Sequence, residues 1–205
     1  MFRHIVSFLA VAAISVFPAP HAETSAAQSG EKNFKFGLSS GYYYQLADLK
    51  NGTQPELEVV EQRGAYVAAK AGYYIEQDPS LTWGIELEPG FMFGLSASVT
   101  SNPNIGDVET YHIAVPVYAV AQFTFLENWK ADMGLGTGAM LYNIGDKVTD
   151  GGTVFPVFVK AGASIAVSEK MTFGGDLRFH YSTVEPDDIL SVWGIGAGAS
   201  LTYMF

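Results

Sequence analysis

Two histidines, His112 and His180, are the side chains best suited to acid–base chemistry in this chain of 205 residues, because the other two of its four histidines lie near the N-terminus. A serine nucleophile with a histidine base and an acid is an arrangement used in hydrolysis and acyl transfer. The residues that could complete such an arrangement near the ends of the same segments are Ser96, Ser98, Ser182, Asp187 and Asp188. His180 precedes Ser182 by two positions, but a His-x-Ser spacing arises often by chance. We therefore predict that the protein is not an enzyme and that both histidines are polar residues at one rim of the fold.

Six charged residues interrupt otherwise apolar or glycine-rich segments. They carry three positive and three negative charges: Lys70, Glu86, Glu88, Lys160, Asp176 and Arg178. An isolated buried charge is very costly, so charges at such positions must pair with one another if they are buried. What these residues do depends on the elements that carry them and on which way each side chain points.

Strict alternation of apolar with small or polar residues dominates the chain. This period of two is typical of β-strands with two different faces. It recurs in eight segments, which cover residues 34–46, 65–75, 81–95, 111–125, 129–142, 155–167, 171–181 and 193–205. The connections alternate in length: residues 48–61, 100–107, 143–152 and 182–191 are long and polar, whereas 76–80, 126–128 and 168–170 are short. The pattern predicts an all-β, eight-stranded antiparallel up-and-down barrel.

The apolar faces of these strands decide whether such a barrel is soluble or lies in a membrane. An eight-stranded barrel has a lumen just wide enough for side chains. A soluble lipocalin-like barrel turns its apolar face inward, but the large residues here are too many for that lumen, whereas the glycine-rich face fits. Aromatic residues also lie near both ends of the strands, as the two interfaces of a membrane favour. We therefore predict a transmembrane β-barrel with the six charged residues inside it.

Inside the barrel, the six charged residues are predicted to form an ion-pair network that blocks the lumen. A tight turn at Asp78 and Pro79 would place Lys70 nearly opposite Glu86. The same reasoning places Lys160 beside Arg178, so that those two cations need acids from elsewhere in the lumen. The alternative is a gated pore for small solutes, since a network of this kind could rearrange.

The final strand carries a family resemblance. Its apolar face ends in Leu201, Tyr203 and Phe205, and such a strand would be an aggregation-prone edge unless a barrel closed over it. The pattern resembles the C-terminal signature of bacterial outer-membrane β-barrels, and the whole mature chain resembles the small porin-like group that includes OmpA transmembrane domains, OmpX-like and opacity-type proteins. The resemblance implies a location in the bacterial cell outer membrane and recognition of Leu201, Tyr203 and Phe205 by the barrel assembly machinery.

The N-terminal segment predicts export. Arg3, an apolar run over residues 5–17 and several small residues after it are typical of a secretory signal peptide, and the run is too short for a membrane-spanning helix. We predict a signal peptide over residues 1–27, with cleavage near 22 to 27, and one outer-membrane β-barrel domain over residues 28–205.

The net charge of the chain limits the classes of partner that it can bind. The formal net charge of −10 makes nucleic acid an improbable partner, because phosphate binding needs a basic face. The long connections and their flanks are acidic, and no cofactor or metal site is predicted. The resemblance implies a surface-exposed role in envelope structure, adhesion or host interaction, with outer-membrane lipid, lipopolysaccharide and a host or surface ligand as expected partners. The alternatives are a channel for small or hydrophobic solutes and an enzyme that modifies lipid A.

Overall fold

A computed structural model describes residues 32–50, 57–78, 80–99, 111–143, 152–182 and 189–205. The strands are β1 (Lys32–Lys50), β2 (Leu57–Asp78), β3 (Leu81–Leu87), β4 (Gly90–Val99), β5 (Tyr111–Leu126), β6 (Trp129–Asn143), β7 (Gly152–Val154), β8 (Val157–Ala166), β9 (Met171–Ser182) and β10 (Ile189–Met204). Within the described part of the chain, no helix is long and apolar enough to cross a membrane.

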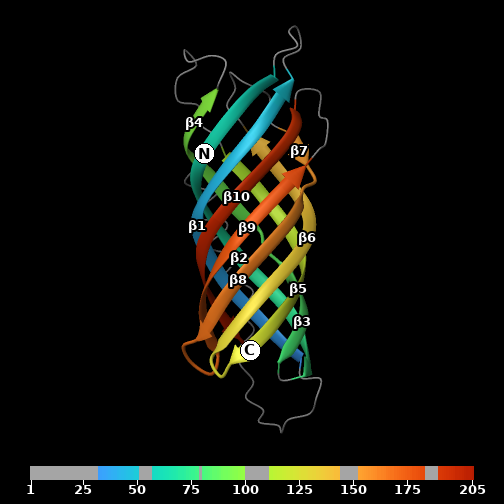
Figure 1. Ribbon diagram of the computed structural model, residues 1–205, viewed down its shortest axis with the longest axis vertical. Coiled ribbons are helices and arrows are strands. Elements are labelled where there is room, and N and C mark those ends of the chain that lie inside the picture. The colour runs from blue at the N-terminus through green and yellow to red at the C-terminus, as the bar shows by residue number, and fades with distance from the viewer. Residues whose placement is uncertain (1–31, 51–56, 79, 100–110, 144–151, 183–188) are drawn as a thin grey trace.

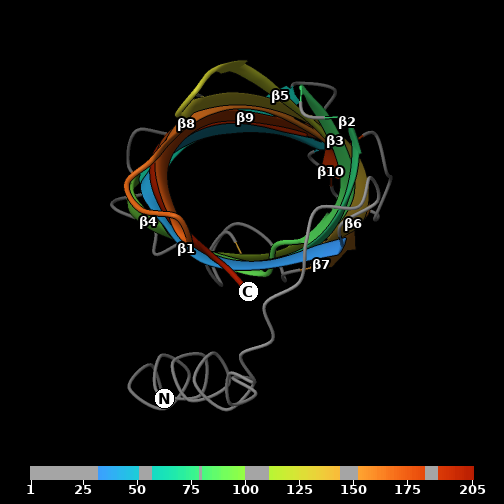
Figure 2. The same cartoon turned by 90° about the horizontal axis from the view of Figure 1, so that it is seen from below.

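The strands form one closed ring (Figures 1 and 2). Every pairing is antiparallel, and β1 pairs with β2 on one side and with β10 on the other. Closure satisfies the backbone groups that an open sheet would leave at its edges, which a lipid environment requires. The predicted eight-stranded antiparallel up-and-down barrel is confirmed.

Two of the eight predicted strands are each divided into two segments at a proline. β3 and β4 are separated by Glu88 and Pro89, and β7 and β8 by Phe155 and Pro156. Proline has no N–H for the ladder, so the regular hydrogen bonding stops there. The same register on β5 continues across the first break, where Leu87 faces Val117 and Gly90 faces Ala114. The ten segments therefore occupy eight positions around the barrel.

The two faces of the wall differ as the alternation predicts. Large apolar side chains stay exposed on the outside, with Leu38 at 63% and Ile85 at 62% relative accessibility. Aromatic residues such as Tyr43, Tyr66 and Tyr118 are buried inside. The core of this protein is thus its lumen, and its apolar exterior suits hydrocarbon.

Strand ends differ from the prediction at the first long connection. The polar segment 48–61 was expected to be a loop, but β1 runs to Lys50 and β2 begins at Leu57, with Asp48 paired to Val59. A polar run in the sequence shows only where a strand leaves the apolar environment. The backbone hydrogen bonds between β1 and β2 continue beyond that point. The short connection after β5 matches the prediction, because β6 starts at Trp129.

Candidate functional site

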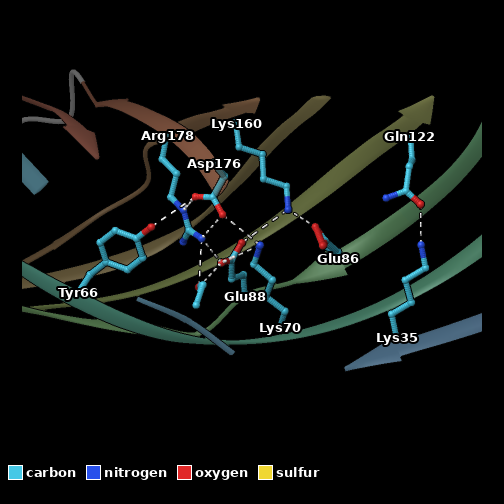
Figure 3. Close-up of polar contacts among 10 residues, drawn as sticks. Lys35, Tyr66, Lys70, Glu86, Glu88, Gln122, Lys160, Asp176 and Arg178 are labelled. Atoms are coloured by element: carbon cyan, nitrogen blue, oxygen red, sulfur yellow. Dashed lines mark hydrogen bonds and ion pairs between the residues drawn. The ribbon is translucent and has the colours of Figure 1, made fainter. Parts of the chain in front are cut away.

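Glu88 lies at the centre of the charged residues in the lumen (Figure 3). It sits in the break between β3 and β4, and its side chain is fully buried. Its carboxylate is 2.7 Å from an Arg178 nitrogen, 3.6 Å from Lys160 Nζ and 4.0 Å from Lys70 Nζ. Three cations from three different strands thus converge on one carboxylate.

Two further carboxylates complete the network. Asp176 on β9 accepts from Arg178 at 2.5 Å and from Lys70 at 3.2 Å. Glu86 on β3 pairs with Lys160 on β8, on the far side of the lumen. The structure therefore brings all six sequence-predicted residues together, from strands β2, β3, β8 and β9 and from the break between β3 and β4.

The pairing within the network differs from the prediction at one position. Lys70 was expected opposite Glu86, but Gly72 occupies that position, and Lys70 Nζ lies 4.0 Å from Glu88 instead. The ladder of β2 and β3 pairs Glu76 with Thr82, which shifts the partner of Lys70 by two residues. Lys160 does face Arg178, as expected, and both reach acids on other strands.

Several lumen residues outside the six predicted ones support the network. Tyr66 places its ring 4.5 Å from the Arg178 guanidinium carbon, and Tyr118 places its ring 4.6 Å from Lys160 Nζ. Such cation–π contacts add to the ion pairs where water is excluded. Ser39 donates to Glu88 at 3.1 Å and accepts from Arg178 at the same distance. Their inward positions in the alternation were the signal that could have identified them.

Lys35 lies at the short-turn end of the lumen, separate from the six residues (Figure 3). It donates to Gln122 at 2.6 Å, and its Nζ is 3.9 Å from the centre of the Tyr74 ring. This contact links β1 to β5 across the lumen, apart from the network.

Glycines facing the lumen make room for these large side chains. A Cβ on Gly72 or on Gly84 would lie 2.6 Å from the Tyr74 ring, and one on Gly134 would lie 2.9 Å from Lys160 Cγ. A Cβ on Gly198 would overlap the Tyr66 hydroxyl. The glycine-rich face is therefore the complement of the buried tyrosines and lysines.

The two histidines meet near the end of the barrel that carries the long connections. His180 Nε2 is 3.1 Å from Gln45 Oε1, and His112 Nε2 is 2.6 Å from Gln62 Oε1. Ser182 is buried on the same inner face as His180. The side chains of Ser96 and Ser98, as well as Asp187 and Asp188, lie outside the described residues. Among the residues that the structure describes, no group of three or more His, Asp or Glu side chains could hold a metal ion.

A cavity of about 30 Å³ lies between His180 and the ion-pair network. Its lining includes Met92, Ala114, Glu88, Arg178 and His180. A space of this size holds about one water molecule. Beside this cavity, the lumen is occupied by the charged residues of the network and by buried tyrosines such as Tyr66 and Tyr118.

The residues of the predicted assembly signal lie where the ring closes. The Phe205 N–H donates to the Phe34 carbonyl at 3.0 Å, and its ring lies 4.8 Å from that of Tyr203 and 6.0 Å from that of Phe36. Leu201 pairs with Leu38. These side chains form part of the apolar exterior at the junction of β1 and β10.

A closed antiparallel barrel with an apolar exterior and a charged, side-chain-filled lumen defines a transmembrane β-barrel. The family model described as the outer membrane protein beta-barrel domain matches residues 9–205. The chain belongs to this family, and the protein is a bacterial outer-membrane protein. The predicted signal peptide over residues 1–27 lies outside the described residues and stays a prediction.

Solved structures agree on the fold. Neisserial surface protein A shares 14% identity at a TM-score of 0.58, over 83% of this chain and 97% of that one. The outer membrane protein AlkL in lipid bilayers shares 16% identity at 0.51, over 93% and 97%. The N-terminal β-barrel domain of OprF from Pseudomonas aeruginosa shares 13% at 0.50, over 86% and 99%. No curated protein sequence matches the chain.

Proposed function

We propose that the protein is a closed outer-membrane barrel that supports acidic surface connections for adhesion or host interaction, and that it neither conducts solutes nor catalyses a reaction. The observation that carries this proposal is the convergence of three cations on the buried carboxylate of Glu88. Breaking a buried pair of this kind costs about 3–5 kcal/mol, so the network resists opening.

The charge of the connections supports the surface role. The long connections and the residues that flank them include Asp107, Glu109, Asp146 and Asp150, with few cations among them. In outer-membrane barrels the long connections face the outside of the cell. Acidic side chains there can bind divalent cations that bridge to lipopolysaccharide phosphates, or a basic surface on a host or partner. We propose lipopolysaccharide and such a basic surface as the partners.

The positions of the histidines argue against lipid A modification. The lipid substrate would lie outside the wall, whereas His112, His180 and Ser182 are buried inside it. Both histidines bind glutamine amides, and no carboxylate of the described residues forms an ion pair with either one. A base without an orienting acid is poorly equipped for acyl chemistry.

Planar-bilayer recording of the purified protein tests the closed lumen. We expect no stable conductance at neutral pH. The double variant Glu88→Ala/Arg178→Ala removes the central pair and should produce conductance steps, which demonstrates that the protein inserts in the assay. Stable pores in the wild type would overturn the closed barrel and favour the solute channel.

A gene-deletion strain and its complemented counterpart separate the three candidate functions by three measurements. We expect loss of adhesion to host cells, with unchanged uptake of small solutes and an unchanged lipid A mass spectrum. Complementation with Asp187→Asn/Asp188→Asn should restore less adhesion than the wild-type gene. Loss of solute uptake would favour a channel, and an altered lipid A mass would favour an enzyme.

The C-terminal residues supply a separate proposal about assembly. We propose that Leu201, Tyr203 and Phe205 are read by the barrel assembly machinery. The variant Phe205→Ala should lower the amount of folded barrel in outer-membrane fractions, whereas Met204→Ala, on the opposite face, should not. Equal amounts of both variants in the membrane would contradict it.

A further inference from the structure

Four side chains from four strands meet at the long-connection end of the lumen. Gln45 on β1, Gln62 on β2, His112 on β5 and His180 on β9 are all buried, and we refer to them as the histidine–glutamine cluster. Gln45 Nε2 donates to Gln62 Oε1 at 3.2 Å, in addition to the two histidine contacts described above. The cluster therefore ties together strands that are not all neighbours in the wall.

Nε2 is the ring nitrogen through which both histidines contact the glutamines. Gln62 Oε1 and Gln45 Oε1 can only accept, so Nε2 of His112 and Nε2 of His180 each donate to them, and the 3.3 Å approach of Gln45 Nε2 to His112 Nε2 is then a contact between two donors. The remaining ring nitrogen, Nδ1, is where a further proton would bind. In His112 this atom is buried and has no hydrogen-bond partner. A protonated His112 would thus hold a buried charge and an unpaired donor.

The surroundings offer no compensating charge among the described residues. Opposite His112 lie Met92 on β4 and Tyr142 on β6, and the Tyr43 ring on β1 is 6.3 Å away. Opposite His180 lie Phe158 on β8 and Gly194 on β10.

The charged groups that line the same cavity as His180 do not compensate the charge of a protonated imidazole either. They are Arg178, which is a cation, and Glu88, which already faces three cations. Tyr66, which also lines the cavity, is a neutral phenol in contact with Asp176. A proton on either imidazole therefore adds uncompensated positive charge to this part of the lumen.

We propose that the histidine–glutamine cluster is an acid-released latch: protonation of both imidazoles separates His112 from His180 and admits water to the cavity beneath them, while the ion-pair network stays closed. Gln45 contacts both rings, with its Oε1 3.1 Å from His180 Nε2 and its Nε2 3.3 Å from His112 Nε2, so two cations here repel each other, and water relieves both charges. In the network below, by contrast, each carboxylate is already paired with a cation. The inference rests on the proposed closed barrel, and it adds a state in which only the outer part of the lumen is hydrated.

Cysteine reactivity tests the latch, because the chain has no native cysteine. Ala114→Cys places a reporter in the cavity wall, and Val120→Cys places one on the same strand and face, on the other side of Tyr118. Both sites are buried, at 2% and 1%. Each variant is reconstituted in lipid vesicles and treated with 4,4′-dithiodipyridine, which reacts with thiols in acid. Rates are normalised to those of Glu169→Cys in an exposed turn.

Between about pH 7.5 and about pH 4, where a hydrated imidazole gains its proton, the normalised rate at Ala114→Cys should rise at least about tenfold. The rate at Val120→Cys should not change. Adding His112→Gln/His180→Gln should abolish the rise, since glutamine does not titrate in this range. Unchanged heat-modifiable mobility of each variant on gels verifies that the barrel stays folded.

Three results would overturn the latch: no rise at Ala114→Cys, a rise that persists without the histidines, or an equal rise at Val120→Cys. Conductance separates this failure from that of the proposed function. A wild-type barrel that conducts at neutral pH contradicts the closed lumen, whereas a silent barrel whose Ala114→Cys reporter ignores acid contradicts only the latch.

Discussion

The outer and inner faces of the barrel wall differ in which side chains they tolerate. On the outside, exposed leucines and aromatics face hydrocarbon, and neighbouring side chains need only be apolar. On the inside, large side chains meet specific partners, as the three cations around Glu88 and the glycines beside Tyr74 illustrate. The outer face therefore tolerates changes in shape but not in charge, and the inner face tolerates neither.

Removing the central inner carboxylate should have the largest effect. Glu88→Ala leaves Lys70, Lys160 and Arg178 with two carboxylates, and we expect a loss of about 3–5 kcal/mol in the free energy of unfolding. Urea titration in lipid vesicles, followed by tryptophan fluorescence, measures it. Glu169→Ala in an exposed turn is the control and should change nothing. Equal stability of the two variants would contradict the central role of Glu88.

A charge on the outer face should have the next largest effect. Leu177 is 59% exposed on β9, between the inward Asp176 and Arg178. Leu177→Lys places a cation in hydrocarbon and should cost about 2–4 kcal/mol in the same titration. Leu177→Ile keeps the surface apolar and serves as its control. If the lysine variant were as stable as the isoleucine variant, the outer face would not lie in lipid.

Adding one methyl group distinguishes the two faces by shape alone. Gly84→Ala brings a Cβ within 2.6 Å of the Tyr74 ring and should cost about 1–3 kcal/mol. Gly175→Ala, on the outer face, meets nothing closer than 3.4 Å and should be tolerated. Thermal unfolding of both variants checks this difference. A tolerated Gly84→Ala would mean that the lumen is less tightly packed than described.

The smallest expected effect comes from two adjacent serines. Ser39 bonds to Glu88 and Arg178 inside the lumen, whereas Ser40 is exposed outside. Ser39→Ala should cost about 0.5–1.5 kcal/mol, and Ser40→Ala should be neutral. Urea titration of the pair resolves this difference, and equal values would mean that the Ser39 hydrogen bonds add no stability.

The sequence predicts whether each residue faces the lumen or the outside, but it does not predict the position of the residue along the barrel axis. A period of two assigns Lys70, Glu86 and Asp176 to the lumen without any knowledge of their neighbours. Which acid meets which cation depends on register, and the ladder at Glu76 and Thr82 moved Lys70 from Glu86 to Glu88.

The histidine–glutamine cluster could not be predicted from the sequence for a related reason. Its four members come from β1, β2, β5 and β9, and only the closed ring brings them together. The breaks at Pro89 and Pro156 were also missed, because alternation continues through a residue that cannot donate to the ladder.

The seam between β1 and β10 has a kinetic consequence. It pairs Lys35 with Met204. The contacts that close the barrel therefore join residues that are far apart in the sequence. Contacts of such long range form slowly, because a large loop must be ordered before they are made. Until β10 pairs with them, β1 and β9 each keep an edge whose backbone N–H and C=O groups are unpaired. The nascent protein is therefore most vulnerable to self-association in the interval just before its two ends meet.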